Sequence, residues 1–225
     1  MRSWCLRPGP ATEIAMRTRV KICGITNLAD ALRAATLGAD YLGFNFYNGS
    51  PRYITPAKAR RIVRQLPRGV KPVGIFVDAP PRKIAEIARQ AGIRIIQLHG
   101  GAPSREVLGL ARKFGIWRVI RVRGALRTEQ VRRLRSVQAL LLDAFHPDAK
   151  GGTGKTFDWK LARKAKRHGR IILAGGLTAE NVGEAIRVVH PWAVDVANGV
   201  ELRPGKKDAR RMRAFVRAVR AAKVR

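Results

Sequence analysis

Acidic residues and cysteines are scarce in this 225-residue sequence. Asp and Glu number 15 against 46 Lys and Arg, which gives a formal net charge of +31 at pH 7. The two cysteines, Cys5 and Cys23, follow no secretory hydrophobic segment, which argues against a disulfide framework and indicates a reducing cytoplasm. The sequence contains no run of about eighteen apolar residues, which is the length needed to span a bilayer, so we expect no membrane partner.

The excess of positive charge is spread along the chain. Arg outnumbers Lys 33 to 13, and arginines occur from Arg2 to Arg225. Pairs such as Arg60-Arg61 and Arg210-Arg211 lie opposite apolar stripes, where a solvated helix face is expected. This distribution favours the interpretation that the positive charge covers the whole surface, and non-specific binding of nucleic acid stays open.

Composition and length indicate one folded domain after a short extension. The chain is 46% hydrophobic and 27% charged, too apolar for a disordered polymer. Residues 1–16 contain Pro8-Gly9-Pro10 and lack periodicity, so we expect an irregular N-terminal extension, with Met16 as a second candidate start. Residues 17–225 are then one domain.

Short apolar runs alternate with segments of helical period. Eight runs have the length and composition of buried strands: 20–23, 41–46, 73–77, 95–98, 117–122, 139–144, 171–174 and 193–196. Apolar spacing predicts helices over 28–35, 59–66 and 212–219. Thr55-Pro56 and Thr178 are predicted to begin helices as capping residues.

Eight strand–helix units predict an α/β fold, a single (β/α)₈ barrel. A short strand followed by a helix implies parallel pairing, and about 205 residues suffice for a compact barrel. An open doubly wound sheet is the alternative. No G-x-G-x-x-G motif follows the first strand, which removes the dinucleotide-binding reason for that alternative.

Candidate catalytic groups follow the first and sixth strands, because barrel active sites lie at strand carboxyl ends. Asp143 ends an apolar strand, where burial would raise its pKa toward general-acid duty; a capping role is the alternative. Cys23 ends the first strand and could instead be a small buried hydrophobe. Among histidines 99, 146, 168 and 190 only His99 falls at this rim, and their spacing indicates no metal.

Two glycine-bearing loops indicate a phosphate site. Gly175-Gly176 and Asn198-Gly199 follow the seventh and eighth strands, where barrels commonly bind phosphate; a tight turn is the alternative for the first pair. Residues 151–156 resemble the end of a Walker A motif, but Ala149 replaces the required glycine. We interpret this segment as a lid, with Lys155 directed at an anionic substrate.

Six motifs in order resemble the phosphoribosylanthranilate isomerase family. They are VKICGIT (20–26), GADYLGFNFYNGSPRYITP (38–56), IQLHG (96–100), LLDA followed by GGTGKTFDW (141–159), LAGGLTAENV (173–182) and DVANGVE followed by PGKKD (195–208). The resemblance spans Val20 to about Phe215. It implies a (β/α)₈ barrel that catalyses an Amadori rearrangement in tryptophan biosynthesis without a cofactor.

The resemblance also implies residue roles. The aspartate matching Asp143 protonates the furanose ring oxygen, and the cysteine matching Cys23 then removes the proton at C2. Because a free thiol has a pKa of about 8.5, we expect a positive environment near Cys23, to which Arg52 could contribute. Arg52 is expected chiefly to hold the anthranilate carboxylate through its planar fork.

Further residues complete the implied substrate site. His99 and Asp195 would contact the substrate, while Gly175, Gly176, Asn198 and Gly199 would bind phosphate. The family usually has two serines where this chain has Ala197-Asn198. Little is lost if phosphate binds backbone N–H groups, whereas a serine hydroxyl contact to phosphate would be gone. The implied partner is this small substrate, and the implied oligomeric state is a monomer or a homodimer. Whether the enzyme also accepts the related histidine-pathway aminoaldose is left open.

Other functions remain as alternatives. A metal-dependent epimerase would need clustered His and Asp ligands, which are missing. An indole-glycerol-phosphate synthase would need a catalytic lysine on an early strand, but Lys21 is out of phase with Ile22 and is expected to face away from the site. A barrel that binds polyanions without catalysis would show steep salt dependence.

Overall fold

The computed structural model describes residues 17–100, 109–122, 137–144 and 159–222. The predicted extension 1–16 and the glycine-rich segment 151–156 with Lys155 lie outside these ranges.

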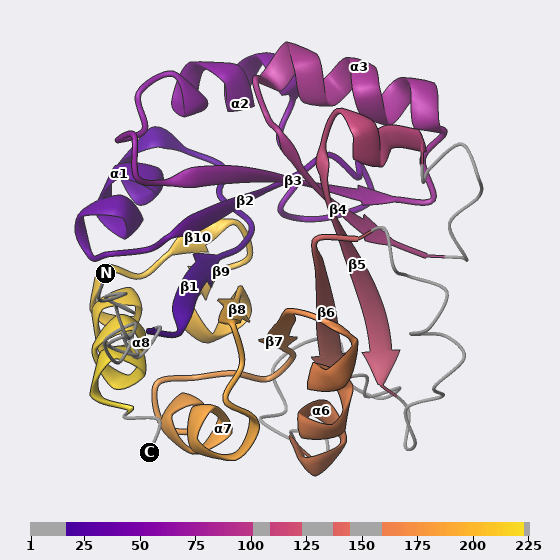
Figure 1. Cartoon of the computed structure of the whole chain (residues 1–225). Coiled ribbons are helices and arrows are strands. Elements are labelled where there is room, and N and C mark those ends of the chain that lie inside the picture. The colour runs from indigo at the N-terminus through magenta and orange to yellow at the C-terminus, as the bar shows by residue number, and fades with distance from the viewer. Residues whose placement is uncertain (1–16, 101–108, 123–136, 145–158, 223–225) are drawn as a thin grey trace, which may run out of the picture.

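Eight parallel strands form a closed barrel (Figure 1). They are β1 (Arg19–Ile22), β2 (Tyr41–Asn45), β3 (Lys71–Val77), β4 (Ile95–His99), β5 (Gly115–Val122), β6 (Ala139–Ala144), β7 (Ile171–Ala174) and β8 (Ala193–Val196). Each strand pairs with the next in sequence, and β8 pairs with β1. The predicted strands are confirmed to within two residues at each end, and the open-sheet alternative is wrong.

Helices lie outside the barrel in Figure 1. Those within the described ranges are α1 (Leu28–Thr36), α2 (Pro56–Val63), α3 (Pro81–Ala91), α6 (Trp159–Ala165), α7 (Val182–Val189) and α8 (Ala209–Ala221), with 3₁₀ turns η1 (Leu110–Arg112), η2 (Lys166–His168) and η3 (Asn198–Val200). The three helices expected from apolar spacing are confirmed.

One of the two predicted helix starts is confirmed. The Thr55 side chain accepts a hydrogen bond from the Lys58 backbone N–H at 3.3 Å, and Pro56 opens α2. Thr178 is not a helix cap, because α7 begins four residues later and Asn181 is its N-cap. Asn181 Oδ1 accepts from the Thr178 N–H at 2.9 Å, so its side chain organises the turn before the helix.

Strand side chains alternate between two apolar clusters, as a period of two requires. On β6, Leu140 and Leu142 pack toward the helices, whereas Ala139 and Leu141 belong to a second cluster inside the barrel. Asp143 continues the interior series at the end of β6. The same alternation places Lys21, Cys23, Gln97, His99 and Asp195 on the interior series of their strands.

A short antiparallel hairpin links β8 to α8. It consists of β9 (Glu201–Arg203) and β10 (Lys206–Lys207), and it lies beside β1 in Figure 1. The Lys207 N–H donates to Asp30 Oδ2 of α1 at 2.9 Å. This bond ties the hairpin to the start of the fold, next to the carboxyl ends of β1 and β8.

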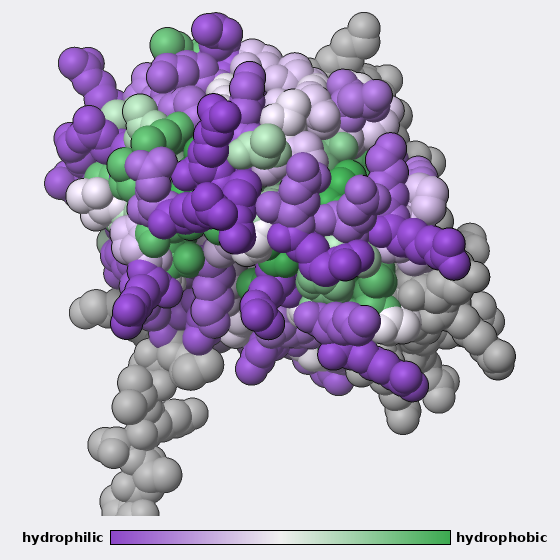
Figure 2. Space-filling model, turned by 90° about the horizontal axis from the view of Figure 1, so that it is seen from above, coloured by the Kyte–Doolittle hydropathy of each residue, from purple (hydrophilic) through white to green (hydrophobic). Residues whose placement is uncertain are grey.

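The surface is hydrophilic over the face in Figure 2, with small scattered apolar patches. This agrees with the scattered arginines of the sequence. No helix among the described residues is both long enough and apolar enough to cross a membrane.

Candidate active site

The carboxyl ends of the strands enclose a cavity of about 270 Å³. Eight of the residues predicted for the site line it: Cys23, Arg52, His99, Asp143, Gly175, Gly176, Asp195 and Asn198. The ninth, Gly199, lines a neighbouring cavity of about 400 Å³ together with Gly176 and Asn198. The barrel therefore gathers residues from six separate segments at one end.

Asp143 is held in a setting that favours its protonated form. Burial raises its pKa from 3.8 to about 6, and the Asp195 carboxylate adds to the rise. Arg121 and Lys21 act in the opposite direction and limit the shift. A carboxyl group with this pKa can donate a proton near neutral pH.

Cys23 follows β1, and its N–H donates to the Val196 carbonyl oxygen at 2.8 Å. Burial and the Asp195 carboxylate raise the pKa of its thiol above the ordinary value, while the ammonium groups of Lys21 and Lys207 lower it. Cations therefore do surround the thiol, as expected, but burial outweighs them. In the free protein Cys23 is mainly the neutral thiol at pH 7.

Lys21 faces the interior, which corrects the expectation that it would face away from the site. Its Nζ lies 2.8 Å from Asp195 Oδ2, and its side chain is fully buried. The physical reason is period two: residues 21 and 23 share one side of a strand, so Lys21 lies with Cys23. Asp195 Oδ1 is buried and accepts no hydrogen bond from the described residues, which leaves an acceptor for a ligand.

His99 lies two residues beyond Gln97 on the same side of β4. Gln97 Nε2 and His99 Nε2 are 2.8 Å apart. Burial, with Lys21 and other nearby cations, lowers the pKa of His99 to about 4, so the ring is neutral at pH 7. The strand-end pattern does not single out Gln97; its signal in the sequence is its place in the IQLHG motif, in phase with His99.

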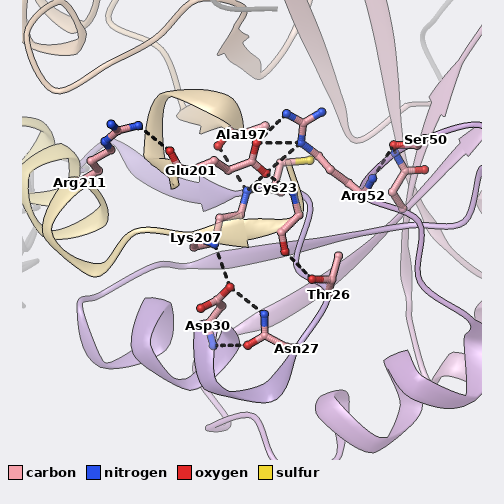
Figure 3. A network of polar contacts seen from close by, with 12 residues as sticks. Cys23, Thr26, Asn27, Asp30, Ser50, Arg52, Ala197, Glu201, Lys207 and Arg211 are labelled. Atoms are coloured by element: carbon pink, nitrogen blue, oxygen red, sulfur yellow. Dashed lines mark hydrogen bonds and ion pairs between the residues drawn. The ribbon is translucent and has the colours of Figure 1, made fainter. Parts of the chain in front are cut away.

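Arg52 is already engaged by an acidic side chain. Its Nε lies 2.9 Å from Glu201 Oε1, and its Nη2 lies 2.6 Å from Glu201 Oε2 (Figure 3). Lys207 Nζ in turn lies 2.8 Å from Glu201 Oε1. The strand-end pattern singles out neither Glu201 nor Lys207, although both fall in motifs quoted above.

The loops after β7 and β8 meet where phosphate was predicted. Gly175 and Gly176 both have positive φ, 85° and 63°, which explains glycine there on conformational grounds alone. Asn198 and Gly199 form the start of η3. Arg211 of α8 also lines the 400 Å³ cavity and adds a cation that sequence analysis missed.

No group of three or more potential metal ligands occurs among residues 17–100, 109–122, 137–144 and 159–222.

Comparison with known proteins identifies the family. The family model described as N-(5'phosphoribosyl)anthranilate (PRA) isomerase matches residues 20–218. The N-(5'-phosphoribosyl)anthranilate isomerase of Pelobacter propionicus is 49% identical over 88% of this chain and 94% of its own length. The chain belongs to the N-(5'-phosphoribosyl)anthranilate isomerase family.

Solved structures of phosphoribosylanthranilate isomerases agree with this assignment. Monomers generated from the dimeric enzyme of Thermotoga maritima give a TM-score of 0.81 at 40% identity, covering 91% of this chain and 99% of that chain. A second isomerase was solved in complex with reduced 1-(o-carboxyphenylamino)-1-deoxyribulose 5-phosphate; it gives a TM-score of 0.78 at 39% identity and covers 90% and 98% of the two chains.

Family membership decides among the functional alternatives. The chain is a phosphoribosylanthranilate isomerase of tryptophan biosynthesis, acting on a small phosphorylated substrate. The epimerase and indole-glycerol-phosphate synthase alternatives are set aside.

Proposed function

We propose that this chain converts N-(5-phosphoribosyl)anthranilate into 1-(2-carboxyphenylamino)-1-deoxyribulose 5-phosphate with Asp143 as general acid and Cys23 as general base. One observation carries these roles: both side chains line a single cavity, and Asp143 has its pKa raised to about 6. Titrating groups with shifted pKa values that line one cavity are typical of an acid–base catalytic site.

Asp143 acts first. It gives its proton to the furanose ring oxygen, the bond between C1 and that oxygen breaks, and the amine nitrogen lone pair forms a C=N⁺ bond to C1. The raised pKa keeps a useful fraction of Asp143 protonated near neutral pH. The product of this step is an open-chain iminium ion.

Cys23 acts second. The iminium acidifies the C–H at C2, and the Cys23 thiolate takes that proton while the released electron pair forms the C1=C2 bond and neutralises the nitrogen. The resulting enolamine becomes the ketone when C1 gains a proton and the C2 hydroxyl loses one. The thiolate is the minor form of Cys23 in the free protein at pH 7, and the ammonium groups of Lys21 and Lys207 favour it. No cofactor takes part in these steps.

The remaining predicted residues bind substrate. Arg52 holds the anthranilate carboxylate, and neutral His99 with the free oxygen of Asp195 contacts the sugar or amine. Phosphate binds to backbone N–H groups of Gly175, Gly176, Asn198 and Gly199. Backbone donors tolerate the replacement of two serines by Ala197-Asn198, because that contact depends on no side-chain hydroxyl.

The localisation and the oligomeric state of the protein belong to the same proposal. We propose a cytoplasmic enzyme, supported by the low cysteine content, that works as a monomer or a homodimer. Size-exclusion chromatography with light scattering would distinguish the two states.

The roles are tested by following the fluorescence of phosphoribosylanthranilate generated in situ. The parent should remove it rapidly, while Asp143→Asn and Cys23→Ala should each lower kcat by about 10²–10⁴-fold. Glu86→Gln, the same kind of change on an exposed face of α3, is the control and should leave the rate unchanged. Full activity in either active-site variant would overturn the assigned role.

A further inference from the structure

Glu201, which contacts Arg52, is a buried acidic side chain that the catalytic steps do not use. Glu201 is 4% exposed, and both of its carboxylate oxygens receive hydrogen bonds from Arg52 (Figure 3). Glu201 Oε1 also accepts from Lys207 Nζ at 2.8 Å and from the Gly205 N–H at 3.2 Å. A buried carboxylate with this many donors is held in one orientation.

The Arg52 guanidinium has two edges that can each bind a carboxylate, and Glu201 binds one of them. A guanidinium can bind carboxylates along the side formed by Nε and one terminal nitrogen, or along the end formed by both terminal nitrogens. Glu201 occupies the side formed by Nε and Nη2. Arg52 also lines the 270 Å³ cavity, and within the described residues its side-chain hydrogen bonds use Nε and Nη2 but not Nη1. The end formed by Nη1 and Nη2 is left for a ligand.

Lys207 holds this arrangement to the barrel. Its Nζ donates to the carbonyl oxygen of Cys23, to that of Ala197 at 3.3 Å, and to Glu201. An ammonium group has three donors, and all three are used. The side chain of Lys207 is fully buried, so the carboxyl ends of β1 and β8 and the Glu201 carboxylate are fixed relative to one another.

The position of Arg52 next to Glu201 is also fixed by contacts of the Arg52 backbone and of its aliphatic side-chain carbons. A Cβ added to Gly24 would lie 2.5 Å from Arg52 Cδ, so the arginine stem packs where only glycine leaves room. The Arg52 N–H donates to Ser50 Oγ at 3.1 Å, which fixes the backbone from which the stem extends. Backbone, stem and guanidinium are thus each constrained.

We propose that Glu201, held by Lys207, is a positioning residue that clamps one edge of Arg52 and presents the other to the carboxylate of the aromatic amine on the substrate. The inference rests on the proposed role of Arg52 in holding that carboxylate. Two cations and one anion leave this cluster with a net positive charge, which the substrate carboxylate neutralises. Glu201 and Lys207 therefore contribute to selecting substrates that carry the carboxylate.

The test compares two substrates, phosphoribosylanthranilate and the phosphoribosylaniline that lacks the carboxylate. Preference is the ratio of their kcat/KM values. Arg52→Met should reduce the preference of the parent by about 10²-fold, and Glu201→Gln by about tenfold, chiefly through KM for the carboxylated substrate. In the double variant Glu201→Gln should add nothing to Arg52→Met, because it acts through that arginine.

Each outcome has a separate meaning. If Glu201→Gln slows both substrates equally, Glu201 is only structural and the inference fails. If Arg52→Met leaves the preference unchanged, the proposed role of Arg52 fails instead; if the parent turns over neither substrate, the proposed function fails. Circular dichroism checks folding, and Glu201→Asp, which keeps the charge but shortens the reach to Arg52, carries the test if Glu201→Gln does not fold.

Discussion

The two ends of the barrel interior are built from opposite kinds of residues. At the amino-terminal end, Tyr41, Trp117 and Trp192 pack ring against ring, with the Tyr41 and Trp117 centroids 4.9 Å apart. At the carboxyl end, Lys21 and Asp195 form a buried ion pair beside the partly buried Asp143. On β6, the side facing the interior changes from apolar residues to Asp143 within a few residues.

The contrast indicates that stability and chemistry are separated along the barrel axis. Burial of aromatic rings favours folding, because large apolar surfaces leave water. Burial of charged groups opposes folding unless each is paired, and Asp143 is held against its preferred ionisation. Changes at the base should therefore lower stability without lowering activity, and changes at the mouth should lower activity without lowering stability.

The largest stability effect is expected from Trp117→Ala at the base. Trp117 is fully buried, and its Nε1 donates to Gln138 Oε1 at 3.1 Å. Removing the ring leaves a cavity, so the free energy of unfolding in urea should fall by about 3–5 kcal/mol. KM for phosphoribosylanthranilate, measured where the variant is folded, should remain that of the parent.

The companion variant is Cys23→Ala at the mouth, which removes one atom and should change stability far less while losing activity. Loss of turnover in folded Trp117→Ala, with stability near that of the parent, would show that the base takes part in the chemistry. The separation of the two ends would then be wrong.

Much of this division follows from the sequence. Asp143 and Cys23 could be assigned to the mouth because each ends an apolar run, and strand carboxyl ends meet at one rim. The clamp on Arg52 could not be deduced in this way. Glu201 is 149 residues from Arg52 and Lys207 is 184 from Cys23, so these contacts depend on where the last hairpin docks rather than on local pattern.

Helix capping shows the same limit at short range. Thr55 could be recognised as a cap because proline follows it, which fixes the first helical position. Thr178 has the right residue type, but Asn181 takes the cap position and bonds back to the Thr178 N–H. Residue type alone did not decide which of two capping residues begins the helix.

The next effect is a dependence of stability on pH that belongs to Asp143. Its pKa is higher in the folded chain, about 6, than its ordinary 3.8, so the stability tied to its proton is full below pH 3.8 and is lost as pH rises through about 6. Asp143→Asn lacks this loss. Relative to the parent, the variant should gain about 2 kcal/mol between pH 4 and pH 7, measured by urea unfolding across that range.

Glu180→Gln is the matched control for the sign of the effect. Glu180 is exposed, and a hydrogen bond from Thr178 lowers its pKa, so its contribution is present above the ordinary pKa and lost as pH falls. The control should therefore show a small trend opposite to that of Asp143→Asn. A stability difference for Asp143→Asn that stays constant from pH 4 to pH 7 would contradict the raised pKa.

The smallest effect concerns the outer rim of the base. The Arg19 and Arg170 guanidinium carbons lie 4.9 and 5.3 Å from the centroid of a Trp192 ring, which gives two of the many arginines a definite contact. Because Arg170 is exposed, its stacking should contribute only about 0.5–1 kcal/mol, and Arg170→Ala should lower the urea midpoint slightly. Arg163→Ala, an exposed arginine of α6, is the comparison. Equal midpoints for the two variants would mean that the stacked arginine adds nothing to the base, and that its stability resides in the buried rings alone.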